Sequence, residues 1–339
     1  MNVLPVGVDM SKATFQAAIW RSSAGQTLGE YGNRRPDFET FATRGHQIQQ
    51  EEGYETVHLV VEPTGGYEQG LVAFAYDQGW RISLPNPRHV REWAKASGRR
   101  AKTDAQDTLL LAHFAAERQQ PAQQPLPCEV RELDSLLKRR DALEAMPRQE
   151  RNRPEAYQHH PHAHPGLAGS FERLITTLEE ELRTVQDEIE RHVQRHSPIA
   201  AHVGRLTQIP GIGPRTVPPL LVLLFRWHAL TGGRRSAKRF IALTGLDPQP
   251  FQSGASVHKR TTISRLGDRA MRRRLSMAAL GGLRGTNPFR DFYDRLVGRG
   301  KPKKVAPIAA ARKLATWAWA VFASETDFDP ARVAPAVSS

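Results

Sequence analysis

The sequence predicts an N-terminal α/β domain, an antiparallel pair of long helices and a mostly α-helical C-terminal domain. Residues 1–118 alternate between short apolar runs and amphipathic segments, as do strands and the helices that cover a sheet. Residues 119–199 contain two long segments with apolar residues three and four apart, which is typical of helices that pack along their length. Residues 200–339 carry 24 basic and 7 acidic side chains, a net charge of +17, whereas the two preceding regions carry −1 and −3. This concentration of positive charge indicates a polyanionic partner.

The first 118 residues contain five predicted strands and four predicted helices. The strands are expected at residues 6–8, 15–20, 28–33, 57–61 and 81–84, and the helices at 38–50, 67–78, 88–96 and from about 104. Three strands in a meander followed by strand–helix units predict a mixed sheet flanked by helices, as in the ribonuclease H fold. We expect this domain to cover residues 1–120.

Four acidic residues occupy equivalent places in this pattern. Asp9 and Glu62 each follow a short apolar strand, and Asp104 and Asp107 lie three apart at the start of a helix, so that they share one face. Any one of them alone would be read as a turn or capping residue. Together they form a set of hard oxygen ligands suited to Mg²⁺ or Mn²⁺. Two such ions about 3.5–4 Å apart can bind the attacking and leaving oxygens of a phosphodiester.

The middle of the chain, residues 121–199, is predicted to be a linker and a coiled-coil arm. Residues 119–127 are rich in Gln and Pro, and helices are expected at 129–146, where Pro147 should interrupt the first, and at 170–196. The four histidines between His159 and His164 are interleaved with prolines, which favours a mobile loop over a metal site. No role is predicted for the single cysteine, Cys128.

The basic C-terminal domain, residues 200–330, contains two features that suit phosphate chemistry. Gly211 and Gly213 form a Gly-x-Gly turn followed by Arg215, as in helix–hairpin–helix elements that bind phosphate through backbone amides, although a plain helical turn would also explain it. Ser253 lies in a Gly-containing loop and is a candidate nucleophile toward a phosphate. The candidate nucleic-acid contacts after it are Lys259, Arg260, Arg265, Arg269, Arg272 and Arg273.

Composition limits the class of protein further. Hydrophobic residues make up 39% of the chain, the mean hydropathy is −0.52, and no run reaches the ~20 apolar residues of a membrane span. The first residues show no signal-peptide pattern. One cysteine excludes an internal disulfide framework and suits a reducing cytoplasm.

Taken jointly, these motifs resemble the DEDD transposases of the IS110 group of insertion sequences. The resemblance rests on residues 8–9, 61–65 and 102–107 in the first part of the chain, and on 209–214, 245–248 and 252–254 in the second. It implies a RuvC-like domain whose acidic quartet binds Mg²⁺. It also implies that Ser253 forms a covalent phosphoserine link to DNA during strand exchange. The expected partners are donor and target DNA, a structured bridge RNA, and further copies of the chain in a dimer or tetramer. The expected location is the bacterial cytoplasm, in association with the nucleoid.

Two other classes remain open on the residues alone. A stand-alone RuvC-like nuclease, such as a junction resolvase, would hydrolyse DNA with the quartet and would leave Ser253 and the basic domain without a chemical role. A non-catalytic nucleic-acid-binding protein would leave the four acids as structural residues.

Overall fold

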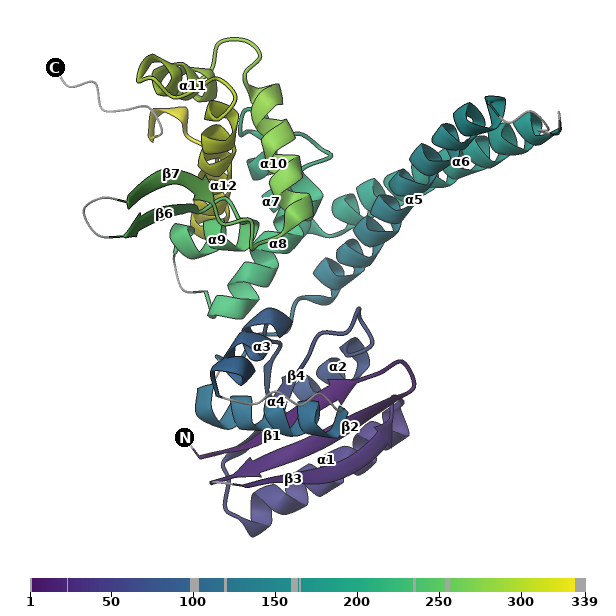
Figure 1. Cartoon of the computed structure of the whole chain (residues 1–339), viewed down its shortest axis with the longest axis vertical. Coiled ribbons are helices and arrows are strands. Elements are labelled where there is room, and N and C mark those ends of the chain that lie inside the picture. Colours follow the sequence, from purple (N-terminus) through teal and green to yellow (C-terminus); the bar gives the residue numbers. More distant parts are fainter. Residues whose placement is uncertain are drawn as a thin grey trace. The chain divides into compact units, whose positions relative to one another are not determined.

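The computed structural model describes residues 2–22, 24–97, 104–118, 121–159, 164, 166–233, 236–253 and 257–332 (Figure 1). The chain divides into two units, each with its own hydrophobic core. Unit 1 comprises residues 1–125 and 229–233, and unit 2 comprises residues 126–228 and 234–339. None of the helices in the described part of the chain combines the length and the apolar character that a membrane crossing requires.

Unit 1 is built on a five-stranded mixed sheet with the strand order β3-β2-β1-β4-β5. Its strands are β1 (Val3–Met10), β2 (Thr14–Arg21), β3 (Ala24–Gly32), β4 (Thr56–Val61) and β5 (Arg81–Ser83). β1, β2 and β3 form an antiparallel meander, whereas β4 lies parallel to both β1 and β5. The predicted mixed sheet is therefore confirmed, and all five predicted strands are present.

Helices cover both faces of this sheet. On one face, α1 (Arg35–Glu51) and α2 (Gln69–Asp77) pack onto a core that includes Phe41, Leu59 and Leu71. On the other face, α3 (Pro87–Ala96) and α4 (Asp104–Arg118) enclose a smaller core around Val60 and Trp93. Alternate residues of β4 thus serve opposite layers, as the twofold repeat of a strand requires.

The segment after α4 follows the edge of the sheet. The Ser83 hydroxyl donates to the carbonyl of Pro121 at 3.1 Å, and the Gln123 amide donates to the carbonyl of Ile82 at 2.8 Å. The Gln124 amide donates to the carbonyl of Ala229 at 3.0 Å, which ties the returning segment 229–233 into unit 1.

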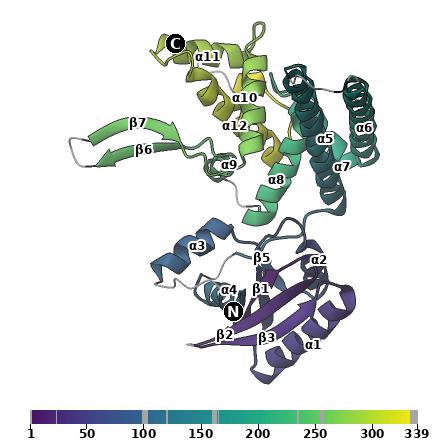
Figure 2. The ribbon, with the colours of Figure 1, turned by 45° about the vertical axis from the view of Figure 1, so that its right-hand side comes forward.

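Unit 2 begins with two long helices, α5 (Cys128–Gln158) and α6 (Leu167–Arg195), which pack side by side (Figure 2). Their register is antiparallel, because His192 contacts the carbonyl of Glu129 near one end and the ring of Tyr157 lies 5.5 Å from that of Phe171 near the other. The expected break at Pro147 is wrong, since α5 continues through it. Proline removes one backbone hydrogen bond from a helix interior, and packing against α6 outweighs that loss.

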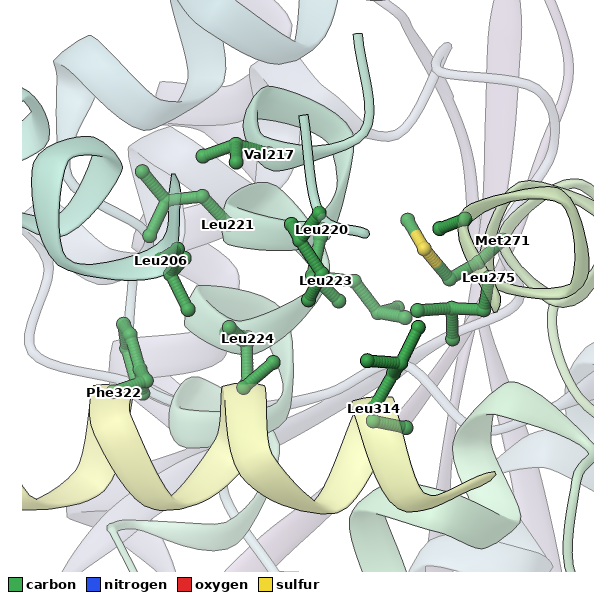
Figure 3. Packing of buried hydrophobic residues seen from close by; sticks show 14 of the residues in the cluster. Leu206, Val217, Leu220, Leu221, Leu223, Leu224, Met271, Leu275, Leu314 and Phe322 are labelled. Carbon is green, nitrogen blue, oxygen red and sulfur yellow. The ribbon is translucent and has the colours of Figure 1, made fainter. Parts of the chain in front are cut away.

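The rest of unit 2 is mostly helical, as predicted. Its helices are α7 (Ser197–Thr207), α8 (Val217–Thr231), α9 (Ala237–Thr244), α10 (Arg269–Gly282), α11 (Pro288–Gly298) and α12 (Ala306–Ser324), followed by a 3-10 turn at Pro330–Arg332. The last residues of α8, from Ala229 on, belong to unit 1. The apolar side chains of α7, α8, α10 and α12 form one core, with Leu206, Leu220, Leu275 and Leu314 fully enclosed (Figure 3). An antiparallel hairpin of β6 (Pro248–Ser253) and β7 (Val257–Ile263) was not predicted.

Candidate active site

Asp9 and Glu62 lie next to each other at the carboxyl ends of two parallel strands. Val8 of β1 is level with Val61 of β4, and the Glu62 amide donates to the Val8 carbonyl at 3.3 Å. Residues that are level in parallel strands project from the same face of the sheet. Asp9 and Glu62 therefore share a face, and it is the face that α3 and α4 cover, because Arg91 of α3 pairs with Glu62 at 3.6 Å.

Helix α4 crosses this face in direct contact with β1 at Gly7. A Cβ atom on Gly7 would lie 2.2 Å from the amide nitrogen of Ala112 and 2.7 Å from the carbonyl oxygen of Thr108. Only glycine allows a helix backbone to come so close to a strand. Gly7 and Asp9 are two residues apart, so they project from the same face of β1.

The direction of α4 is fixed by a second contact. His113 stacks on Trp20 with ring centroids 4.0 Å apart, and Trp20 lies in β2 beyond the residue that pairs with Val6 of β1. The C-terminal half of α4 therefore points toward the start of β1, and its N-terminal end points toward Asp9. Asp107, half-buried in the first turn of α4, is thereby brought to the edge that carries Asp9 and Glu62. Asp104 begins α4, but its side chain lies outside the described residues.

The three described acids converge on one edge without closing around a point. Among the described residues, the set of three ligand atoms that lie within 4.8 Å of one another belongs to Glu132, His192 and His196 of unit 2, not to the acids. The donor set consists of hard oxygens, which is the chemistry that Mg²⁺ and Mn²⁺ prefer. The residues at this edge therefore fit a divalent metal, with Arg91 as a neighbouring positive charge.

The predicted nucleophile, Ser253, and the predicted nucleic-acid contacts after it lie in and after the β6–β7 hairpin of unit 2. Ser253 is the last residue of β6 and pairs with Val257 in the ladder, but its side chain lies outside the described residues. The same holds for the side chains of Lys259 and Arg260, whose backbone belongs to β7. The structure thus gives these residues a position in the chain fold and no contacts.

The arginines that the sequence predicts as nucleic-acid contacts differ in exposure. Arg265, Arg269 and Arg273 are exposed, and the last two lie four residues apart on one face of α10. Arg272 differs, because its Nη1 is buried without a hydrogen-bond partner among the described residues. The neighbouring Arg274 also turns inward and pairs with Asp141 of α5 at 2.5 Å.

The Asp141 carboxylate holds two arginines at the junction of α5 and α10. Besides Arg274 it contacts Arg140, at 2.8 Å, whose side chain is only 2% exposed. Burial raises the pKa of Asp141, but the hydrogen bonds from Arg274 and Arg140 outweigh that effect and hold the pKa below its usual value. Arg274 therefore serves the fold, a role that the run of basic residues in the sequence did not reveal.

The Gly-x-Gly turn lies between α7 and α8 and packs on α10. Gly211 has φ = +89°, and a Cβ on it would lie 2.5 Å from the carbonyl oxygen of Ala278. This glycine is thus required by close packing of the turn on α10. Nothing lies within 4 Å of a Cβ built on Gly213, and Arg215 is exposed. Of the three proposed phosphate contacts in this turn, Gly213 and Arg215 have free space beside them.

Sequence reasoning missed one group, formed by Glu132, His192 and His196. The two histidines stand four residues apart at the end of α6, a spacing that places them on one helix face and could have identified them. The histidines at 159–164 are a denser tract and give the stronger pattern in the sequence. Of that tract, residues 160–163 lie outside the described part of the chain.

The strand order, the acids at the ends of β1 and β4, and a third acid on the helix that crosses them are consistent with a DEDD nuclease-like fold. Residues 6–157 match a family model described as "Transposase", the DEDD transposase domain of IS110 elements. Residues 203–294 match one described as "Transposase IS116/IS110/IS902 family". The chain belongs to the IS110 family of transposases.

Individual relatives agree with this assignment. The chain is 30% identical to the "Pilin gene-inverting protein" of Moraxella lacunata over 331 residues, which is 97% of this chain and 98% of the relative. The protein of the same name from Moraxella bovis matches equally well. The chain is also 29% identical to the "Insertion element IS110 uncharacterized 43.6 kDa protein" of Streptomyces coelicolor. That match covers 151 residues, 44% of this chain and 34% of the relative.

Proposed function

We propose that this transposase cuts and rejoins DNA with a metal site in unit 1 and a serine nucleophile in unit 2. The observation that carries the proposal is the convergence of Asp9, Glu62 and the N-terminal end of α4 on one edge of the sheet. Asp9, Glu62, Asp104 and Asp107 would hold Mg²⁺ or Mn²⁺, as in RuvC-like domains. Such ions polarise a phosphodiester and stabilise the charge that develops on its oxygens.

The chain's own residues divide the remaining work. The four carboxylates would hold the metal at the end of the strands, and Arg91 places a positive charge 3.6 Å from Glu62. In unit 2, the Ser253 hydroxyl attacks phosphorus, its proton passes to a neighbouring base or water, and a DNA oxygen departs. The exposed Arg265, Arg269 and Arg273 would contact the phosphate backbone, as would Lys259 and Arg260 of the hairpin. Arg272, whose Nη1 is buried, would reach a phosphate only after its side chain turns outward.

A covalent link is favoured over hydrolysis by what the relatives do. A protein named for inverting a gene has to rejoin the strands that it cuts. A phosphoserine link conserves the energy of the cleaved bond for rejoining, whereas attack by water loses it. We therefore place this chain with recombinases instead of with stand-alone resolvase-type nucleases. Both units have to act on one phosphodiester, within one chain or across a homo-oligomer.

A guide RNA and the phosphate-binding turn complete the proposal. The net charge of +17 over residues 200–339 supports a large polyanionic partner. We propose that this partner includes a bridge RNA in addition to donor and target DNA, and that the turn at Gly211 to Arg215 acts as a helix–hairpin–helix contact. Sequencing the RNA that copurifies with the full chain tests the first point. Recovery of only random cellular RNA would contradict it.

The decisive experiment concerns Ser253. Labelled DNA incubated with wild-type protein and metal should give a protein–DNA adduct that survives denaturing electrophoresis, and Ser253→Ala should give none while still binding DNA. Ser256→Ala is the matched control, because it removes a hydroxyl three residues away. Mass spectrometry of the modified peptide should assign the link to Ser253. Rejoined products from Ser253→Ala, or an adduct on Ser256, would overturn this part of the mechanism.

A further inference from the structure

A second group of ligating side chains lies where α5, α6 and α7 meet in unit 2. Glu132 belongs to α5, His192 belongs to the last turns of α6, and His196 stands between α6 and α7, where it is the N-cap residue of α7. One ligand atom from each of these residues lies within 4.8 Å of the other two. The two imidazole rings have centroids 4.5 Å apart. This group is separate from the edge of the unit 1 sheet that carries Asp9, Glu62 and Asp107, here called the acidic edge, and from the β6–β7 hairpin.

The hydrogen bonding of His192 leaves one of its nitrogens free to bind a cation. His192 is 5% exposed, and its Nε2 lies 2.8 Å from the carbonyl oxygen of Glu129, which can only accept a hydrogen bond. Nε2 therefore carries the hydrogen, and in the neutral ring Nδ1 has the lone pair. Nδ1 faces the Glu132 carboxylate at 3.9 Å. A carbonyl that fixes the tautomer of a histidine in this way is typical of metal-ligating imidazoles.

A fourth side chain that can bind metal lies beside Glu132, on the carboxylate oxygen that does not face His192. Cys128 is exposed, and its thiol donates to the Glu132 carboxylate at 3.6 Å. Cys128 and Glu132 are four residues apart on α5, and His192 and His196 are four residues apart at the end of α6, where His196 is the C-cap residue. Glu132 faces the two histidines across the antiparallel helices, and Cys128 lies one turn away from it.

We propose that Cys128, Glu132, His192 and His196 bind one Zn²⁺ ion. The set combines thiolate, carboxylate and imidazole, which are the ligands that zinc takes in fourfold coordination. Thiolate and carboxylate together balance the charge of the ion, and on binding the Cys128 proton passes to solvent. Ligand atoms of one tetrahedral zinc lie about 3.3 Å apart, so the 3.9 Å between His192 and Glu132 has to shorten by about 0.6 Å, and the Cys128 thiol has to turn from Glu132 toward the histidines. The Glu132 side chain is 57% exposed and free to make that adjustment, and the same exposure gives the ion a path of entry.

Binding of the ion would join the start of α5 to the end of α6. Leu133 and Ile189, which neighbour the site on α5 and α6, belong to the main core of unit 2, as does Ile199 of α7. An ion held by residues of both long helices would fix the position of the α5–α6 pair against α7. Its binding free energy would add to the stability of the folded state.

The test uses Co²⁺ as the probe, because tetrahedral Co²⁺ absorbs strongly in the visible and a thiolate ligand adds a near-ultraviolet charge-transfer band. Metal-free full-length protein titrated with Co²⁺ should bind one ion with both features and release it to Zn²⁺. Added Zn²⁺ should also raise the melting temperature by at least a few degrees (about 3 °C or more). An ion at the oxygen ligands of unit 1 would give neither feature.

Matched variants assign the ion to its ligands. Glu132→Gln and His196→Gln alter side chains that are not fully buried, so both proteins should fold as judged by circular dichroism and lose the visible band. Cys128→Ser should retain weaker binding and lose the charge-transfer band alone. His228→Gln, which changes an exposed histidine of unit 2, and replacement of His159, His160, His162 and His164 by Asn should leave the spectrum unchanged.

Three results would overturn the proposal. They are the absence of a tetrahedral Co²⁺ spectrum in wild type, an unchanged spectrum in both Glu132→Gln and His196→Gln, and loss of the spectrum in the variant without the 159–164 histidines. In the first case, His192 would be a structural residue that is hydrogen-bonded to Glu129 and paired with Glu132 only when protonated. None of these readouts depends on recombination activity, so they stand or fall apart from the function of Ser253.

Discussion

Substituting Gly7 by alanine tests whether the contact of α4 with β1 positions the acidic edge. The new methyl group would lie 2.2 Å from the nitrogen of Ala112 and 2.7 Å from the oxygen of Thr108, both backbone atoms that cannot rotate away. Restoring a contact of at least 3.0–3.4 Å requires α4 to move by about 1 Å relative to β1. Overpacking of this kind costs about 1–3 kcal/mol of stability. A displacement of ~1 Å in a catalytic group reduces rates on the order of 100-fold.

The assay combines urea unfolding with metal-dependent DNA cleavage by the same preparation. Gly204→Ala is the control, because Gly204 lies in α7, is exposed, and has nothing within 4 Å of an added Cβ. That substitution should be neutral or stabilise the protein by up to about 1 kcal/mol. If Gly7→Ala unfolded at the wild-type urea concentration and cleaved DNA at the wild-type rate, the position assigned to α4 would be refuted.

Three further predictions concern a proposed metal ligand, two exposed arginines and a buried histidine. Asp9→Asn should abolish DNA cleavage in Mg²⁺ or Mn²⁺ while DNA affinity and melting temperature stay near wild type; cleavage in excess chelator would contradict a metal role. Arg269→Ala and Arg273→Ala should each weaken DNA binding alike on all sequences and lower the slope of log K against log salt by about one, as measured by fluorescence titration. Burial, assisted by the nearby charge of Arg81, lowers the pKa of His58 to about 4 from 6.5. Since the unfolded chain then binds a proton that the folded chain does not, stability should fall by roughly 3 kcal/mol as pH drops from 6.5 to 4, and a flat profile in urea unfolding would contradict this.

The sheet and its acids could be predicted because their signals are local. Each central strand is a short apolar run, and each ends beside an acid whose place on the sheet follows from strand order and register. The position of Asp107 could be predicted only as far as its helix. What carries it to Asp9 is the absence of a side chain at Gly7, and that requirement comes from residues a hundred positions later in the chain.

The features that the sequence did not predict depend on contacts between distant segments or on weak patterns. The β6–β7 hairpin contains Pro248 and Pro250 in its first strand and a basic second strand, so the alternation of apolar residues is missing; only Val257 and the β-branched residues 261–263 favour a strand. The ligand group at His192 forms where the start of α5 meets the end of α6, and His192 is 63 residues from Glu129, which it contacts there. Pro147 predicted a break by its local effect alone, and the long partner helix α6 overrode it.

The chain passes between its two units three times, at residues 125–126, 228–229 and 233–234. Segment 229–233 therefore completes unit 1, although about half of unit 2, residues 126–228, separates it from the rest of unit 1 in the sequence. A single crossover between two insertion elements in the intervening region would join a unit 1 from one parent to a closing segment from the other. The backbone bond between Gln124 and Ala229 would survive such an exchange, but side-chain fit at the segment would not be preserved. A graft of a foreign unit 1 therefore has to include this short return segment.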